Sequence, residues 1–338
     1  MTRSTVALTL IGLIAGACAP ETALRARTNT DTWLQAPNNE VDILWVVDDS
    51  CSMGEEQETL SVGFVSFVDE MEASGTDFHI GLITTSFDYN ISERGVLVGE
   101  PQYLTSADDY VTLFAERALV GTDGSDKEKG LEAAAYAVSP IMTVPGGLNE
   151  GFVRKDAHLL VIIVSDEEDC SDQGALEGQP ADDCYEERDK LASVNGLVED
   201  ILDVKKGENN LVQIGAVVGL EGGGCDDAYP GRRYQEAAAL TGGLIGDICS
   251  GDWSNMLTEL GLNASGIQMS FQTEYLAKPE TLDVKVDGES VKEDPGNGWT
   301  YDTSTWHLTF HGASVPGRGA EISALYEIQS GADEPSGG

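Results

Sequence analysis

Two stretches of the chain are almost continuously apolar, and each ends abruptly at acidic or hydroxyl-bearing residues. The first covers residues 41–47 and the second covers residues 159–164. Runs of this length that are rich in Val and Ile and lack polar alternation are typical of parallel strands covered on both faces. We therefore expect both to be buried strands of one sheet.

Between these runs, apolar positions recur at helical spacing. The residues Leu60, Phe64, Phe67, Val68 and Met71 predict a helix after residue 53 that ends at Gly75. Further strands are predicted over residues 79–85 and 211–218, a hairpin-like excursion over 91–103, and helices over 110–118, 131–138, 185–204, 234–240 and 253–260. This alternation predicts an α/β fold with a doubly wound, mostly parallel sheet flanked by helices.

The pattern changes to strands and turns at about residue 268. Strands are predicted over residues 282–286, 299–301, 306–310 and 320–328, with Asp287-Gly288 as a hairpin turn. We therefore expect an α/β domain over residues 41–268, a small all-β module over residues 269–330 that packs against it, and a flexible tail over residues 331–338.

The amino-terminal residues predict export. Residues 1–17 combine Arg3, an apolar run and small residues directly before Cys18. This arrangement resembles a bacterial lipoprotein signal, which implies that Cys18 is lipidated and becomes the new amino terminus; secretion after Ala17 is the alternative. Ala19, in place of aspartate, implies sorting to the outer membrane. Residues 18–40 are predicted to be a polar tether.

The composition narrows the choice of partners. The chain has 59 Asp and Glu against 19 Lys and Arg, which gives a formal net charge of −40. Attraction to nucleic acid or to an anionic lipid surface is therefore disfavoured, and contact with a membrane is expected only through the lipid anchor. Six cysteines without a Cys-x-x-Cys pair favour disulfides over zinc in an exported protein.

The first apolar run leads directly into Asp48-x-Ser50-x-Ser52. Ligands of open α/β sheets bind just beyond the carboxyl ends of the strands. One carboxylate and two hydroxyls at alternate positions supply hard oxygen ligands, which suit Mg²⁺, Mn²⁺ or Ca²⁺. The second run ends in the same way, at Ser165-Asp166.

This pattern resembles the metal-ion-dependent adhesion site of the von Willebrand factor type A family, over residues 41–265. The resemblance implies that Ser50 and Ser52 touch the cation directly, whereas Asp48 and Asp166 act mainly through bound water. It also implies a loop hydroxyl before the helix over residues 131–138 as a further ligand.

Two residues compete for that hydroxyl, Ser125 and Thr122. Ser125 lies six residues before Leu131, as the family's threonine does, and it also starts a potential capping box with Glu128. Ser125 is slightly favoured, with a double role as ligand and cap, and Thr122 is the alternative. The acidic residues 167–169 that follow Asp166 are predicted to be a solvated rim.

Two disulfides are predicted. Cys225 pairs with Cys249 across one helix, closing a loop of about 25 residues, for which chain entropy allows on the order of 3 kcal/mol. Cys170 pairs with Cys184 and leaves Cys51 unpaired; the alternative joins Cys51 to Cys170, because both lie in the predicted metal-site loops.

These features predict a cell-envelope lipoprotein that binds, through its cation, an Asp or Glu carboxylate of a protein or surface ligand. It is not expected to be an enzyme, because no nucleophilic elbow, zinc-protease motif or phosphate-binding loop is present. The alternatives are an envelope scaffold with a purely structural metal and a metal-assisted hydrolase.

Overall fold

The computed structural model describes residues 27–35, 39–73, 75–88, 94–205, 211–222, 225, 228–264 and 267–329. The predicted export signal, the lipidation site Cys18 and the tail at residues 331–338 lie outside the described residues. None of the helices in the described part is long and apolar enough to cross a membrane.

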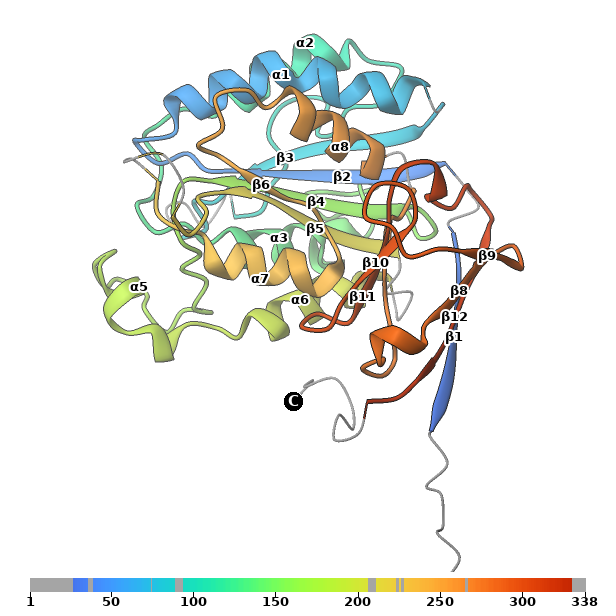
Figure 1. Cartoon of the computed structure of the whole chain (residues 1–338). Coiled ribbons are helices and arrows are strands. Elements are labelled where there is room, and N and C mark those ends of the chain that lie inside the picture. Colours follow the sequence, from blue (N-terminus) through green and yellow to red (C-terminus); the bar gives the residue numbers. More distant parts are fainter. Residues whose placement is uncertain are drawn as a thin grey trace, which may run out of the picture.

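A five-stranded parallel sheet forms the centre of the larger part of the molecule (Figure 1). Its strand order is β3-β2-β4-β5-β6, and every adjacent pair is parallel. The strands are β2 (Glu40–Val47), β3 (Asp77–Thr84), β4 (His158–Ser165), β5 (Val212–Val218) and β6 (Ile245–Asp247). The two apolar runs are thus adjacent central strands, β2 and β4, while the short edge strand β6 escaped prediction.

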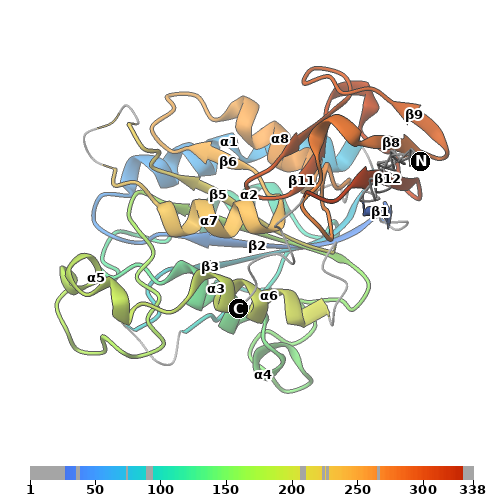
Figure 2. The same cartoon turned by 60° about the horizontal axis from the view of Figure 1, so that its bottom comes forward.

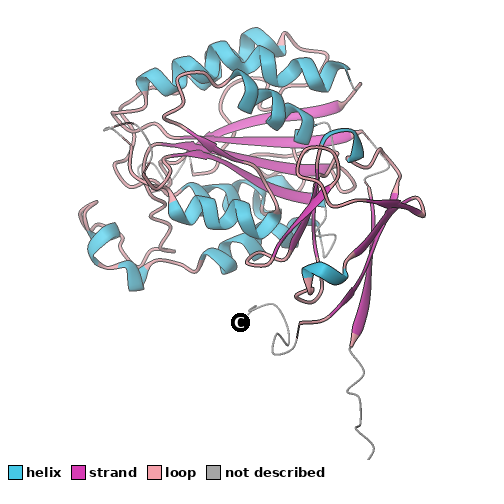
Figure 3. Ribbon diagram, in the orientation of Figure 1, coloured by secondary structure: helices cyan, strands magenta, loops and turns pink. Residues whose placement is uncertain are grey.

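Helices cover both faces of this sheet (Figure 3). One face carries α1 (Gly54–Ala73), α2 (Tyr110–Ala118) and α8 (Ser254–Ala264), and the other carries α3 (Gly130–Val138), α6 (Val194–Leu202) and α7 (Arg232–Thr241). Side chains of a strand alternate between faces. Trp45 of β2 accordingly packs against Phe67 and Phe114, whereas Leu44 and Val46 enter the opposite core. The predicted α/β fold class is confirmed.

One prediction for a connecting segment is wrong. The single helix expected over residues 185–204 is divided into α5 (Asp183–Glu186), a 3-10 turn (Arg188–Lys190) and α6. Residues 188–190 are exposed, so no buried stripe continues the helix across them, and Ser193 starts α6 by accepting a hydrogen bond from the Gly196 amide. The expected hairpin-like excursion over residues 91–103 is present in part: the described residues 94–103 form no strand, but the Val98 amide donates to the Leu82 carbonyl at 2.8 Å and Leu104 forms an antiparallel bridge with Ile80 of β3. The short helix α4 (Pro140–Thr143) follows α3.

A smaller β-rich part contains two antiparallel sheets, ordered β1-β12-β8-β9 and β10-β11-β7. They pack around Phe271, Trp299, Phe310 and Tyr326. The strands are β1 (Thr28–Leu34), β7 (Ser270–Gln272), β8 (Asp283–Val286), β9 (Glu289–Val291), β10 (Trp299–Asp302), β11 (His307–Phe310) and β12 (Glu321–Glu327). The predicted all-β character of this part is confirmed.

Strand β1 corrects the expectation that residues 18–40 form a polar tether. Its seven residues pair with β12, from Thr28 opposite Glu327 to Leu34 opposite Glu321. Polar contacts secure it: the buried Asp31 carboxylate accepts hydrogen bonds from the Tyr326 hydroxyl at 2.7 Å and from a backbone amide at 2.9 Å. A strand held by polar groups near the other end of the chain carries little apolar signal in its own sequence.

The β-rich part contacts the parallel sheet domain at the end where the strands of the sheet begin. Gly242, which caps α7 with φ = 65°, lies against this part: a Cβ added there would sit 2.9 Å from atoms of His307 and Ser270. Figure 2 shows the β-rich part and α5 at opposite sides of the molecule. The carboxyl ends of the strands therefore point away from the β-rich part.

Candidate functional site

Asp48 and Asp166 lie side by side where β2 and β4 end. Val47 at the end of β2 is in register with Val164 of β4, and the Asp48 amide donates to the Val164 carbonyl at 3.0 Å. Parallel register thus brings together two aspartates that are more than a hundred residues apart in the sequence. The sequence predicted two buried strands of one sheet, each followed by an aspartate, and the structure shows that these strands are direct neighbours.

The Asp48 carboxylate is fully buried and is held from two sides. Its Oδ1 accepts a hydrogen bond from the Ser50 amide at 2.8 Å, and its Oδ2 accepts one from the Ser165 hydroxyl at 2.6 Å. Burial, opposed by these hydrogen bonds and reinforced by the charge of Asp166, raises the pKa of Asp48 to about 7. Nearby positive charge would favour its ionised form.

The two predicted serine ligands converge. The hydroxyl oxygens of Ser50 and Ser52 are 3.4 Å apart, with Ser50 buried and Ser52 exposed. Alternate positions in the loop therefore place both hydroxyls on one side, next to Asp48. The sequence spacing predicted this arrangement.

Gln57, which the sequence did not single out, joins the two loops of the site. Its Nε2 donates to the carbonyls of Asp48 at 2.9 Å and Gly121 at 2.8 Å, while its Oε1 accepts from the Gly121 amide at 3.2 Å. The side chain is buried on the first turn of α1. It holds the loop over residues 121–125 against the Asp-x-Ser-x-Ser loop.

Thr122 and Ser125 lie on different sides of that second loop. Thr122 faces the start of α1, since a Cβ added to Gly54 would sit 3.8 Å from its methyl group. Ser125 donates its amide to the Ser86 hydroxyl at 2.6 Å and accepts from the Lys127 amide at 3.0 Å. The hydroxyl of Ser125 thus takes part in a local turn.

The capping-box interpretation of Ser125 and Glu128 is wrong, because α3 begins only at Gly130. Glu128 instead turns inward beside Asp48 and is 1% exposed. Its Oε1 has no hydrogen-bond partner among the described residues. Burial, and then the charges of Asp48 and Glu167, raise the pKa of Glu128 to about 11; burial and Asp166 also raise that of Glu167. The site contains more carboxyl groups than the motif alone indicates.

The predicted solvated rim is wrong for two of its three residues. Asp169 is fully buried and pairs with the Arg233 guanidinium at 3.0 Å, and Glu168 Oε1 accepts from the Arg233 amide at 2.9 Å. These two carboxylates therefore attach the site loop to α7. Only Glu167 remains partly accessible next to Asp166.

Both predicted disulfides are present, Cys170–Cys184 and Cys225–Cys249, and Cys51 is an exposed free thiol. The alternative pairing of Cys51 with Cys170 is therefore wrong. The Cys170 amide donates to the Glu128 carbonyl at 2.6 Å. The first disulfide thus anchors the insertion over residues 171–192 next to Glu128, one of the buried carboxyl groups of the site.

The donor set fits a hard divalent cation. Asp48, Ser50, Ser52 and Asp166 present only oxygens, which suit Mg²⁺, Mn²⁺ or Ca²⁺. No group of three or more His, Cys, Asp or Glu side chains within the described ranges is placed to hold a metal ion. A site of two carboxylates and several hydroxyls does not require such a group.

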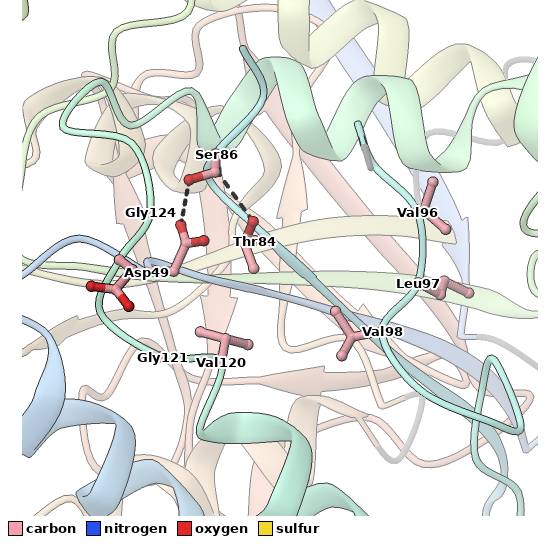
Figure 4. A pocket seen from close by; sticks show the side chains of 10 residues that line it. Asp49, Thr84, Ser86, Val96, Leu97, Val98, Val120, Gly121 and Gly124 are labelled. Atoms are coloured by element: carbon pink, nitrogen blue, oxygen red, sulfur yellow. Dashed lines mark hydrogen bonds between the residues drawn. The ribbon is translucent and has the colours of Figure 1, made fainter. Parts of the chain in front are cut away.

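A cavity of about 470 Å³ opens on the β3 side of the site (Figure 4). Its polar lining includes Asp49, Thr84, Ser86 and Asp123, and its apolar lining includes Val98 and Val120. The Ser86 hydroxyl donates to Asp49 Oδ1 at 2.7 Å. Consecutive aspartates thus border two different features, Asp48 the Asp-x-Ser-x-Ser loop and Asp49 the cavity.

No protein-family model matches this chain, and no curated protein matches it. Solved structures do match. The pilus adhesin SpaC from Lactobacillus rhamnosus GG, in its open conformation, has 12% identity and a TM-score of 0.43, with 89% of this chain and 41% of the adhesin covered. The pilus adhesin RrgA from Streptococcus pneumoniae has 10% identity and a TM-score of 0.38, with 90% and 58% covered.

Proximal thread matrix protein 1 from the mussel byssus matches with 11% identity and a TM-score of 0.40, over 72% of this chain and 52% of that protein. This chain spans less than two thirds of the length of all three proteins. Because their TM-scores lie below 0.5, we draw no conclusion about fold or function from them.

Proposed function

We propose that residues 41–268 form a von Willebrand factor type A domain whose metal-ion-dependent adhesion site binds Mg²⁺, Mn²⁺ or Ca²⁺. Through this cation the protein captures a carboxylate of a protein or surface ligand. The observation that carries the proposal is the meeting of Asp48, Ser50, Ser52 and Asp166 at the carboxyl ends of two adjacent buried strands. In open α/β sheets, ligands bind at such ends.

The electrostatics of the site support a bound cation. The charges that act most strongly on Asp48, Glu128 and Glu167 are those of other carboxylates. Buried carboxyl groups without a compensating positive charge are driven toward their neutral forms. A divalent cation at Asp48 and Asp166 would restore the ionised forms and hold the two loops together.

The proposed roles follow the family resemblance. Ser50 and Ser52 contact the cation directly, a hydroxyl of Thr122 or Ser125 contributes from the second loop, and Asp48 and Asp166 act through water. The Ser125 hydroxyl also accepts a hydrogen bond from the Lys127 amide, and the Thr122 methyl group lies toward the start of α1, so both residues remain candidates. Neutral hydroxyls leave most of the cation's charge uncompensated, so a partner's Asp or Glu carboxylate replaces one of the bound waters.

We propose that the protein acts by binding at the cell envelope. Lipidation at Cys18 would anchor it in the outer membrane, and its two disulfides suit an oxidising compartment. Catalysis would require a nucleophile or general base facing the cation, and the proposal assigns none. The competing interpretation is an envelope scaffold in which the cation only stabilises the loops.

The test uses Mn²⁺ as the cation and Nα-acetyl-glutamate amide as the carboxylate probe. Protein stripped with EDTA is titrated with Mn²⁺, free Mn²⁺ is followed by electron paramagnetic resonance, and the proton relaxation of the probe is then measured. We expect one Mn²⁺ per chain and enhanced relaxation of the probe at the protein-bound ion. Ser52→Ala should weaken Mn²⁺ binding at least tenfold, because its hydroxyl is a direct ligand on an exposed, tolerant position.

Ser106→Ala is the matched control, since Ser106 is an exposed serine in the loop before α2. Equal Mn²⁺ affinity in wild type, Ser52→Ala and Asp166→Asn would contradict the proposed cation site. Mn²⁺ binding without relaxation of the probe would favour the scaffold interpretation. Phosphatase or peptidase activity that depends on Mg²⁺ and disappears in Ser52→Ala would contradict a purely binding role.

A further inference from the structure

The cavity beside the site is bordered by a carboxylate that the cation site does not use. Asp48 turns toward β4, where Ser165 donates to it, whereas Asp49 turns toward the end of β3, where Ser86 donates to it. The two residues are consecutive, and Asp49 is the residue of this loop that lines the cavity (Figure 4). The cavity therefore begins one residue along the chain from Asp48.

The cavity combines negative charge with an apolar wall. Asp49 and the exposed Asp123 supply carboxylates, and Val98 and Val120 supply hydrocarbon surface. Of the described residues that line the cavity, none is basic. Lysine and arginine side chains match such a lining, because their stems bury against apolar groups while their charged ends bind carboxylates.

The carboxylate of Asp49 is held in place before any ligand arrives. Asp49 Oδ1 accepts a hydrogen bond from the Ser86 hydroxyl, and the Ser86 oxygen accepts one from the Ser125 amide at 2.6 Å. The backbone carbonyl of Asp49 accepts a further hydrogen bond from the Gly124 amide at 2.8 Å. Gly124 permits this approach: a Cβ there would lie 2.3 Å from Asp49 Cγ. A fixed acceptor reduces the entropic cost of binding a cationic group.

We propose that this cavity is a subsite for a basic side chain, lysine or arginine, of the same partner segment whose carboxylate is captured at the cation. Its volume, about 470 Å³, lies within the range of small-molecule sites and accommodates one long side chain with water. The ligand is thus a segment that presents an acidic and a basic residue close together. The link to the acidic residue rests on the proposed function, but the cavity itself is testable without it.

The experiment measures binding of Nα-acetyl-arginine amide to the full protein in EDTA, by saturation-transfer difference NMR. Nα-acetyl-citrulline amide, which has nearly the same shape without the charge, is the matched probe. We expect the arginine probe to bind at least fivefold more tightly than the citrulline probe. Asp49→Asn and Asp123→Asn should each weaken binding of the arginine probe, Asp49→Asn by fivefold or more.

Asp109→Asn removes the same charge from an exposed aspartate outside the cavity, at the start of α2, and should change the affinity less than twofold. Equal binding of the two probes, or equal loss in Asp49→Asn and Asp109→Asn, would overturn the proposal, because the attraction would then be unspecific. Since EDTA removes the cation, these results are independent of the Mn²⁺ titration. Failure of one proposal is therefore distinguishable from failure of the other.

Discussion

At the scale of single residues, the adjacent Asp48 and Asp49 lie in two different environments. At the end of a strand, successive side chains face opposite directions, so adjacent aspartates reach Ser165 on one side and Ser86 on the other. One is fully buried and the other remains partly accessible. A shift of one residue in the register of β2 would exchange the two environments.

His158 provides a pH-dependent test at the opposite end of β4. Its ring is fully buried, neither nitrogen has a hydrogen-bond partner in the described part of the chain, and burial followed by the charge of Lys205 lowers its pKa to about 4. The unfolded chain takes up this proton below about pH 6.5 and the folded chain does not. Stability is therefore lost as the pH falls from about 6.5 to 4, by about 3 kcal/mol for this group.

His158→Leu should remove this contribution, so that its unfolding free energy falls less than that of the wild type over the same pH interval. Denaturant unfolding at pH 7, 5.5 and 4 in EDTA measures the difference. His311→Leu, at a partly exposed histidine of the β-rich part, serves as the control and should follow the wild type. A constant difference between His158→Leu and the wild type at all three values would contradict the assignment.

At the scale of elements, periodicity located most of the α/β domain but few of the contacts between its elements. The runs now seen as β2 and β4 are recognisable because they are buried on both faces. Strand β6, with Gly246 at its centre, is too short for such a signal. Strand β1 is stabilised by β12, which lies almost three hundred residues away, so its own residues do not reveal it.

Some residues of the candidate site could likewise be predicted from the sequence, and others could not. Asp48, Ser50, Ser52 and Asp166 could be predicted because they belong to a motif or to a strand end. Gln57, Glu128 and Ser165 could not, since their roles depend on which loops meet across the sheet. The Asp-x-Ser-x-Ser spacing specifies a local arrangement, but parallel register decides what surrounds it.

Gln57 links α1 to the two loops of the site without being a proposed ligand. Its replacement should therefore weaken the contact between these loops. Gln57→Leu preserves volume but removes three hydrogen bonds between α1 and the two loops, and it removes the Gln57 donor from the buried Asp48 carbonyl. We expect a destabilisation of about 2–4 kcal/mol. Hydrogen exchange at the Gly121 amide should accelerate at least tenfold.

Gln235→Leu on α7 removes a single hydrogen bond, to the Gly219 carbonyl after β5; this variant is the control and should leave the Gly121 amide unaffected. The two variants are compared by hydrogen exchange detected by mass spectrometry and by chemical denaturation. Unchanged protection at Gly121 in Gln57→Leu would show that the second loop is held by other contacts.

At the scale of the whole molecule, β1 belongs to the β-rich part although β2, the next strand along the chain, lies in the parallel sheet. A chain that begins at residue 39 should therefore expose the edge of β12 and self-associate, because an unpaired strand edge is a template for pairing. Light scattering after size-exclusion chromatography measures this. Mn²⁺ affinity should remain unchanged, since the proposed site lies at the carboxyl ends of the strands, away from β1. A truncated chain that stays monomeric would contradict the proposed role of β1 in covering β12.

Strand β1 also determines how the molecule carries mechanical load. If Cys18 is fixed in a membrane and the proposed cation site holds a partner, tension enters the described chain at residue 27, directly before β1, and a pull along the axis of this strand acts on its pairing with β12. The seven residue pairs with β12, from Thr28 to Leu34, are then loaded in shear, so their hydrogen bonds resist together rather than opening one after another. Resistance to such a pull depends on the rate of forced opening rather than on equilibrium stability. Strand β1 would thus resist forced unfolding between the lipid anchor and the α/β domain that binds the partner.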